Sequence, residues 1–309
     1  LDLSKKGFAA AKGDLILQHG SLKLASARSA FTNMQLSAFM NGEDLTVKKF
    51  TADFAKGTVK ASGMMKQFKT EGISGFSWSL LDADIDELIP DLPGQNEPRL
   101  AGRLSLNFDG QCTGVTWSDI SRSLTGQGQA GMKDGVVLNY NVLGKLLKKI
   151  SIIPGAEEAI QARLPGVYKA KMNEPHTLLR PVVMPIRILN GQIIVDQMVL
   201  QTDHLTIQGG GLFGLDKSIF ARTYVQVDRA LSSSLAYIVP QLQLLLNAQG
   251  QIEVPGQIQG RFPRVQVLPD KDFIVQKIFA STAQEVISNL IQNPAAAGES
   301  GIQNSVQGL

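Results

Sequence analysis

Short runs in which apolar and polar residues alternate recur along most of this chain. In Leu104–Phe108 and Leu205–Ile207 every second side chain is apolar, which is typical of a strand with one buried and one solvated face. The dipeptides Asp134-Gly135 and Asn190-Gly191 each precede an apolar run, and such dipeptides reach positive φ at low cost. We therefore predict a mostly β protein in which each dipeptide forms a hairpin that begins a new antiparallel strand.

Two segments replace this alternation with apolar residues at helical spacing. The first lies near 141–164 and carries lysines opposite its leucines, and the second lies near 230–247, with a bend expected at Pro240. We predict amphipathic helices in both segments, as insertions in one β-rich region that covers residues 1–269. A further amphipathic helix is expected over 270–293, capped by Asp270, and a disordered tail over 294–309.

The composition suits a folded chain with a large apolar surface. Of 309 residues, 43% are apolar and 18% are charged, and the formal net charge is +3; these values exclude a disordered chain. Basic residues are scattered and seldom interleaved with aromatic ones, so we expect no nucleic-acid partner. The single cysteine, Cys112, excludes an intramolecular disulfide. No stretch approaches the ~20 consecutive apolar residues of a membrane span, so any membrane anchor is expected upstream of Leu1.

No pattern of catalytic or metal-binding residues has the sequence context that its chemistry needs. Glycines at 126–131 and 209–214 fit a dinucleotide fingerprint, but strand patterns follow them instead of a helix, so we interpret them as turn or bulge glycines. The acidic stretch 82–89 lacks the glycine and the bidentate glutamate of a calcium loop and is expected to form a short helix. Asp203 and His204 are strand neighbours that point to opposite faces. We predict no catalytic residues, no metal site and no cofactor.

One face of such a sheet can form an apolar floor of leucine, isoleucine, valine and methionine. Aliphatic side chains lack polar atoms and fixed ring geometry, and the low aromatic content of 6% agrees with such a lining. The predicted floor residues are Leu22, Leu24, Met34, Leu36, Leu104, Leu106, Ile193, Val195, Met198, Leu200, Leu205, Ile207, Val225 and Val227. The helix expected to close or gate one end carries Val142, Leu143, Leu146, Leu147 and Ile150. A slip of one residue in register would exchange the two faces.

The order of these phrases resembles the C-terminal region of the AsmA-like family. Residues 124–147 are similar to its succession of Gly-x-Gly, strand, Asp-Gly, strand and Asn-Val-Leu-x-x-Leu-Leu helix. Residues 45–63 are similar to its strand pair that ends in Ser-Gly, and residues 189–211 to its polar-Gly turn, two strands and glycine-rich turn. These phrases cover most of residues 10–270. The resemblance implies a curved antiparallel meander sheet, described as a groove or β-taco, with a few amphipathic helices.

The same resemblance implies a non-enzymatic protein of the Gram-negative envelope. It would be periplasmic and anchored to the inner membrane by an N-terminal segment outside this chain, as in bridge-like relatives of the TamB and YhdP type. The implied partners are phospholipid or another acyl lipid and outer-membrane assembly proteins, because TamB is linked to outer-membrane assembly and phospholipid traffic. Exposing a ~16-carbon acyl tail to water costs on the order of 10 kcal/mol, which burial in such a groove would offset. The alternative is a structural scaffold or protein-binding module whose sheet closes on a filled core.

Overall fold

A computed structural model describes residues 12–23, 28–88, 99–149, 153–261, 264–270, 273 and 275–277. Its main feature is one antiparallel sheet of fourteen strands. The strands are β1 (Lys12–Leu22), β2 (Phe31–Asn41), β3 (Asp44–Phe54), β4 (Gly57–Lys66), β5 (Ile73–Asp84), β6 (Arg99–Cys112), β7 (Thr125–Leu138), β8 (Thr177–Leu179), β9 (Val182–Leu189), β10 (Gln192–Gln201), β11 (Leu205–Gly214), β12 (Ser218–Val227), β13 (Glu253–Arg261) and β14 (Arg264–Pro269).

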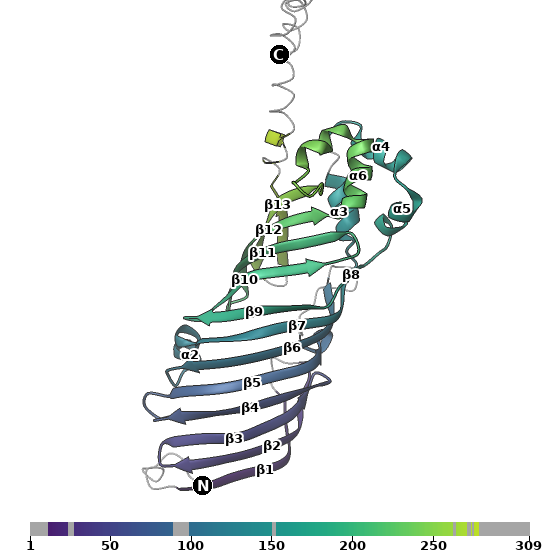
Figure 1. Cartoon of the computed structure of the whole chain (residues 1–309). Helices are drawn as coiled ribbons and strands as arrows, with labels where there is room; N and C mark the ends of the chain where they lie inside the picture. The colour runs from purple at the N-terminus through teal and green to yellow at the C-terminus, as the bar shows by residue number, and fades with distance from the viewer. Residues whose placement is uncertain are drawn as a thin grey trace, which may run out of the picture.

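The strands follow one another in the sheet almost in chain order. The order runs from β1 to β7, then β9 to β14, and the short β8 pairs with β7. Among the described strands β1 and β14 each pair with one neighbour only, and Figure 1 shows β1 and β13 at opposite ends of the sheet. This confirms the predicted mostly β antiparallel meander. The sheet is not closed on itself, so the alternative of a closed sheet is wrong.

Short helices connect the strands in the described part of the chain. They are α1 (Ile85–Leu88), α2 (Trp117–Ser123), α3 (Val142–Lys149), α4 (Ala156–Arg163), α5 (Gly166–Met172), α6 (Arg229–Ile238) and the 3-10 helix η3 (Pro240–Leu245). The segments 141–164 and 230–247 are therefore helical over much of their length, and α6 ends before Pro240. Asp270 Oδ1 accepts a hydrogen bond from the Phe273 N–H at 2.9 Å, as a helix cap does. Most of 270–293 and all of 294–309 lie outside the described residues.

The two dipeptides predicted to form hairpins behave differently. Asn190 (φ 50°) and Gly191 (φ 75°) form the two-residue turn between β9 and β10, as expected. The prediction for Asp134-Gly135 is wrong, because β7 continues through both residues to Leu138. Asp134 has φ 53° and lies where the β6–β7 register shifts, between Ala101 and Arg103. Asp134 and Gly135 therefore form a bulge within β7, and the strand continues to pair with β6 beyond it.

The acidic stretch 82–89 also differs from its prediction. β5 continues to Asp84, and only Ile85–Leu88 are helical. The Asp82 carboxylate lies 2.9 Å from Lys133 Nζ, and Asp84 lies 2.8 Å from Lys56 Nζ. These ammonium groups hold the pKa of both carboxyls below their usual range. Asp82 itself has φ 59° and lies where the β5–β6 register shifts, so the strand continues past it through a bulge.

Register shifts recur across the sheet and bend it. They occur between β1 and β2, β2 and β3, β3 and β4, β5 and β6, β6 and β7, and β10 and β11. An extra residue on one strand bends that strand and increases its twist. Figure 1 shows strands β1 to β7 bending along their length.

The register decides which side chains share a face, because directly paired residues point to the same side. One side, called the apolar face here, carries the aligned row Phe50, Ala61, Trp78 and Phe108. The other side, called the polar face, carries the next row, Thr51, Lys60, Ser79 and Asn107. The alternation of apolar and polar residues therefore gives the sheet one apolar and one polar face across its middle strands, as predicted.

The main core lies where helices cover the apolar face at one end of the sheet. Leu205 of β11, Val227 of β12 and Val254 of β13 pack in one buried cluster with residues of α3, α4, α6 and η3. Leu231 of α6 belongs to this cluster and is fully buried. Figure 1 shows these helices gathered beside β8 to β13. The helices thus act as a cap on this end, called the helical cap below.

An aspartate joins the helical cap to the sheet. Asp228 precedes α6, and its Oδ1 accepts a hydrogen bond from the Leu231 N–H at 2.9 Å. Its Oδ2 lies 2.8 Å from Nδ1 of His204, which stands at the start of β11. The His204 ring also meets Tyr168 of α5 edge to face, with centroids 5.1 Å apart. His204 therefore holds α5 and α6 to the strand ends.

Glycine at position 128 allows neighbouring strands to approach closely on the apolar face. Gly128 pairs with Phe108 on one side and Ile186 on the other, and a Cβ there would collide with the Asn107 carbonyl oxygen. Gly131 lies on the polar face of the same strand, where a Cβ would meet Val183 Cγ2 at 3.5 Å, an ordinary contact. At this position the strands therefore approach more closely on the apolar face than on the polar face.

Replacing Gly128 with alanine is therefore expected to destabilise the protein by about 2 kcal/mol, because the backbone must shift to accept the methyl group. The matched Gly131→Ala variant should stay within about 0.5 kcal/mol of the parent. Urea unfolding followed by circular dichroism measures both. Equal stability of the two variants would contradict the close approach at Gly128.

Candidate functional site

The apolar face is hollowed over β2 to β6. A cavity of about 370 Å³ opens there, and its lining includes no charged residue among those the structure describes. Its walls include Leu36, Val47, Phe50, Met65, Phe76 and Cys112. Most of these side chains are half-buried, so the protein does not fully cover its own apolar surface at this place. We call this hollow the groove.

The Cys112 thiol adds to the apolar wall of the groove. Cys112 is buried, and burial raises the pKa of its thiol. The thiol therefore stays protonated and uncharged at neutral pH, and it acts as a small apolar side chain.

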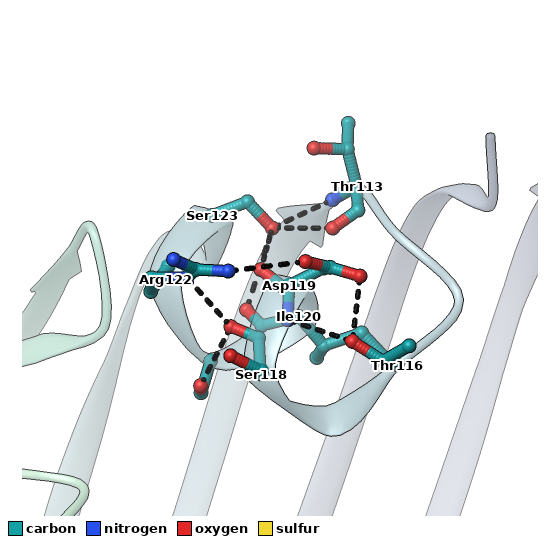
Figure 2. Close-up of polar contacts among 8 residues, drawn as sticks. Thr113, Thr116, Ser118, Asp119, Ile120, Arg122 and Ser123 are labelled. Carbon is teal, nitrogen blue, oxygen red and sulfur yellow. Dashed lines mark hydrogen bonds and ion pairs between the residues drawn. The ribbon is translucent and has the colours of Figure 1, made fainter.

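Helix α2 forms one side of the groove, where Ile120 lies against the cavity. The hydroxyl of Thr116 accepts a hydrogen bond from the Asp119 N–H and donates one to Asp119 Oδ2 at 2.6 Å, which lowers the pKa of Asp119. Ser123 Oγ accepts from the Thr113 N–H and donates to the Thr113 carbonyl (Figure 2). The N-terminus of α2 is thus capped by Thr116, and its C-terminus is fastened to Thr113, which directly follows β6.

The sequence analysis missed α2. The interval between Thr116 and Asp119 is the spacing of a capping box, so a local signal was present. Two apolar side chains are exposed at the start of α2: Val115, in the loop before it, at 51%, and Trp117, its first residue, at 72%. This side of the groove therefore has an apolar outer rim.

The register places all the described members of the predicted floor on the apolar face, and Leu24 lies outside the described residues. They are not equally accessible. Those that are at least partly exposed are Leu22, Met34, Leu36, Leu104, Leu106, Ile193, Leu200, Ile207 and Val225. Those that are buried are Val195, Met198, Leu205 and Val227.

Two of the predicted floor residues belong to the core of the helical cap. Leu205 is 2% exposed and Val227 is fully buried, and both pack against the cap helices. An acyl chain could touch them only if the cap moved. Side chains from α3, α4 and α6 already occupy that space, so these two positions lie beneath the cap and not in the open groove.

The residues of the predicted gating helix divide between two environments. Leu143 and Leu147 of α3 are buried in the cap cluster. Val142 and Leu146 line a second cavity, of about 130 Å³, between α3 and β11 to β13. Ile150 lies outside the described residues. Helix α3 therefore contributes to the core on one side and to a cavity on the other.

The floor is not purely aliphatic, and that expectation is wrong over β3 to β6. Phe50, Phe76, Trp78 and Phe108 lie there on the apolar face, and the Phe76 and Phe108 ring centroids are 6.2 Å apart. Strict alternation misses part of this set, because the register shifts between Val47 and Phe50. A bulge changes the spacing of inward-facing residues from two to three.

The described residues form neither a dinucleotide-binding site nor a metal site. The glycines at 126–131 lie inside β7, Gly209 and Gly211 lie in β11 opposite a bulge of β10, and Gly214 ends β11 at the turn to β12. No helix follows either group directly. No group of three or more histidine, cysteine, aspartate or glutamate residues that could hold a metal occurs in the described part of the chain. Among the same residues, no helix is long and apolar enough to cross a membrane.

Comparison of the chain with protein-family models, with curated proteins and with solved structures found no match.

Proposed function

We propose that this protein is a non-enzymatic, AsmA-like module that shelters lipid acyl chains in the groove on its apolar face. One observation carries the proposal: a cavity of about 370 Å³, without a charged side chain in its described lining, opens on the uncovered apolar face of the sheet. The proposed setting is the Gram-negative periplasm, with an inner-membrane anchor outside this chain. The proposed role is phospholipid transport or outer-membrane assembly.

The energetics of burial support an acyl chain as the occupant. Half-exposed side chains such as Leu36, Phe50 and Phe76 lose contact with water when an apolar ligand covers them, at about 25 cal/mol per Å². Each methylene of the ligand contributes about 0.8 kcal/mol in the same way. Ser62 and Ser74 carry the only side-chain hydroxyls of the described lining, and Ser74 already donates to the Gly72 carbonyl. A hydrocarbon chain therefore fits this lining better than a sugar or a nucleotide, whose many polar groups would lack partners.

The second candidate function is a scaffold that buries the same face against a protein partner. Val115 and Trp117 favour it, because they are exposed beside the groove and exposed tryptophan is enriched in protein interfaces. In that case the groove would take up no free lipid. Lipid uptake therefore distinguishes the two functions.

The two tryptophans of the chain allow a direct test. Neither tryptophan is in the described lining of the groove, but Trp78 lies on the apolar face paired with Ala61, which does line it, whereas Trp117 is on α2 and is 72% exposed. In the Trp117→Phe variant, a dibrominated fatty acid is expected to quench Trp78 fluorescence saturably, because bromine quenches only on close approach. In the matched Trp78→Phe variant, Trp117 should be quenched much less.

Unbrominated fatty acid of the same length serves as the control for nonspecific effects on fluorescence. Quenching of Trp117 alone, or of neither tryptophan, would contradict uptake into the groove and favour the scaffold.

A further inference from the structure

The cavity of about 130 Å³ beneath α3 differs from the main groove in that its lining includes a charged side chain, Lys145. Its floor includes Ile207, Val225 and Val254, which the register aligns across β11, β12 and β13 on the apolar face. Val142 and Leu146 of α3 cover it from the other side. At about 10 to 15 Å³ for each water-sized group, the volume has room for roughly ten such groups. It is therefore an apolar pocket on the same face as the groove.

Two side chains bring polar groups to this pocket from the segment around α3. Lys145 lines the pocket and is exposed, and no described acidic residue forms an ion pair with it. Tyr140 also lines the pocket, and its hydroxyl has no hydrogen-bond partner among the residues that the structure describes. Burial raises the pKa of Tyr140, so its hydroxyl stays a donor at neutral pH. The only other side-chain hydroxyl of the lining is that of the buried Thr223.

The charged residues of the described lining and of α3 are all basic, whereas the acidic Asp270 lies next to the lining residue Pro255, to whose carbonyl its N–H donates at 2.9 Å. Lys145 is the one charged residue in the described lining, and helix α3 also carries Lys148 and Lys149 but no acidic residue. An ammonium and a hydroxyl donor beside an apolar pocket are complementary to a carboxylate or a phosphate attached to a hydrocarbon chain. A cationic head would meet repulsion there, and an uncharged head would leave Lys145 without a partner.

We infer that the pocket beneath α3 is a binding site for an anionic acyl lipid, with part of the chain inside the pocket and the anionic head on Lys145 and Tyr140. The inference rests on the proposed function and deepens it, because it assigns a charge to the lipid and a place to its head. The main groove, which lacks charge in its described lining, would then hold chains without regard to their heads.

Two lysolipids with the same 16-carbon chain test this inference on the whole protein. Lysophosphatidylglycerol carries a net negative charge, and lysophosphatidylcholine carries none. Both are titrated below their critical micelle concentrations by calorimetry. The Lys145→Gln variant is expected to bind lysophosphatidylglycerol roughly fivefold more weakly than the parent, as loss of an exposed ion pair implies, and to bind lysophosphatidylcholine within a factor of two.

A matched control separates this site from general charge. Lys60→Gln removes an exposed lysine from the polar face and should leave both affinities unchanged. If Lys145→Gln and Lys60→Gln weaken lysophosphatidylglycerol binding equally, the attraction is nonspecific and the inference is overturned. Glycerol phosphate at millimolar concentration should not compete, and competition by it would show a site for the head alone.

The outcomes also separate this inference from the proposed function. Equal binding of both lysolipids by the parent and by Lys145→Gln overturns the anionic site but leaves acyl-chain shelter standing. Binding of neither lysolipid, together with no quenching of Trp78, overturns both.

Discussion

Replacing Val47 with aspartate is expected to weaken acyl-chain binding at least about 100-fold. Val47 is half-buried in the wall of the groove, and an acyl chain lying there would have to remove water from the new carboxylate. The effective cost of burying an unpaired ion is several kcal/mol, and each 1.4 kcal/mol is a factor of ten in affinity. Titration with a fluorescent fatty acid measures the loss. Aspartate is chosen because its short side chain cannot carry the charge out of the groove.

The matched control is Thr46→Asp, one residue earlier on the same strand. Thr46 pairs with Met64 on the polar face and is exposed, so the same charge there should change binding less than about twofold. Binding to Val47→Asp should recover partly as the pH falls towards about 4, because a protonated carboxyl carries no charge. Equal binding by the two aspartate variants at neutral pH would show that lipid does not lie along the apolar face.

Replacing Leu231 with alanine is expected to destabilise the helical cap by about 3 to 4 kcal/mol. Leu231 is fully buried among α3, α4, α6 and η3, and truncation of a buried leucine removes its transfer free energy and leaves a cavity. Amide hydrogen exchange should rise most in α3 and α6. The amides of β3 to β6 should keep their protection, because their side chains do not belong to this cluster.

Tyr237 provides the control on the same helix. It is 84% exposed, so Tyr237→Ala should stay within about 0.5 kcal/mol of the parent. If Leu231→Ala increases exchange evenly over β3 to β6 and the cap, then the cap and the groove strands unfold as one unit, and the separation described here is wrong.

Local patterns predicted much of the fold because strands and helices differ in their period. The alternation of Leu104, Leu106 and Phe108 places all three on the apolar face of β6. The helical spacing of Leu143 and Leu147 places both in the cap core. Both predictions depend only on which side chains of a single strand or helix point in the same direction. The period of that element alone fixes this direction.

Where the local patterns failed, pairing between strands determined the backbone structure. Asp134-Gly135 has the composition of a hairpin, but its backbone continues because β6 extends alongside and pairs with both halves of β7. The aromatic part of the floor, Phe50 to Phe108, depends on a bulge that moves Phe50 to the same face as Val47. The residues near each of these positions contain no signal for the partner strand or for the bulge.

The sequence by itself determined an antiparallel meander with one apolar face and two helical segments. It also indicated which side chains belong to that face. Only the tertiary structure decided that Leu205 and Val227 lie beneath the cap while Leu36 lies in an open groove. Alternation reports the side of a strand, whereas coverage depends on contacts between elements far apart in the chain, and those contacts form only when the whole sheet and its helices pack together.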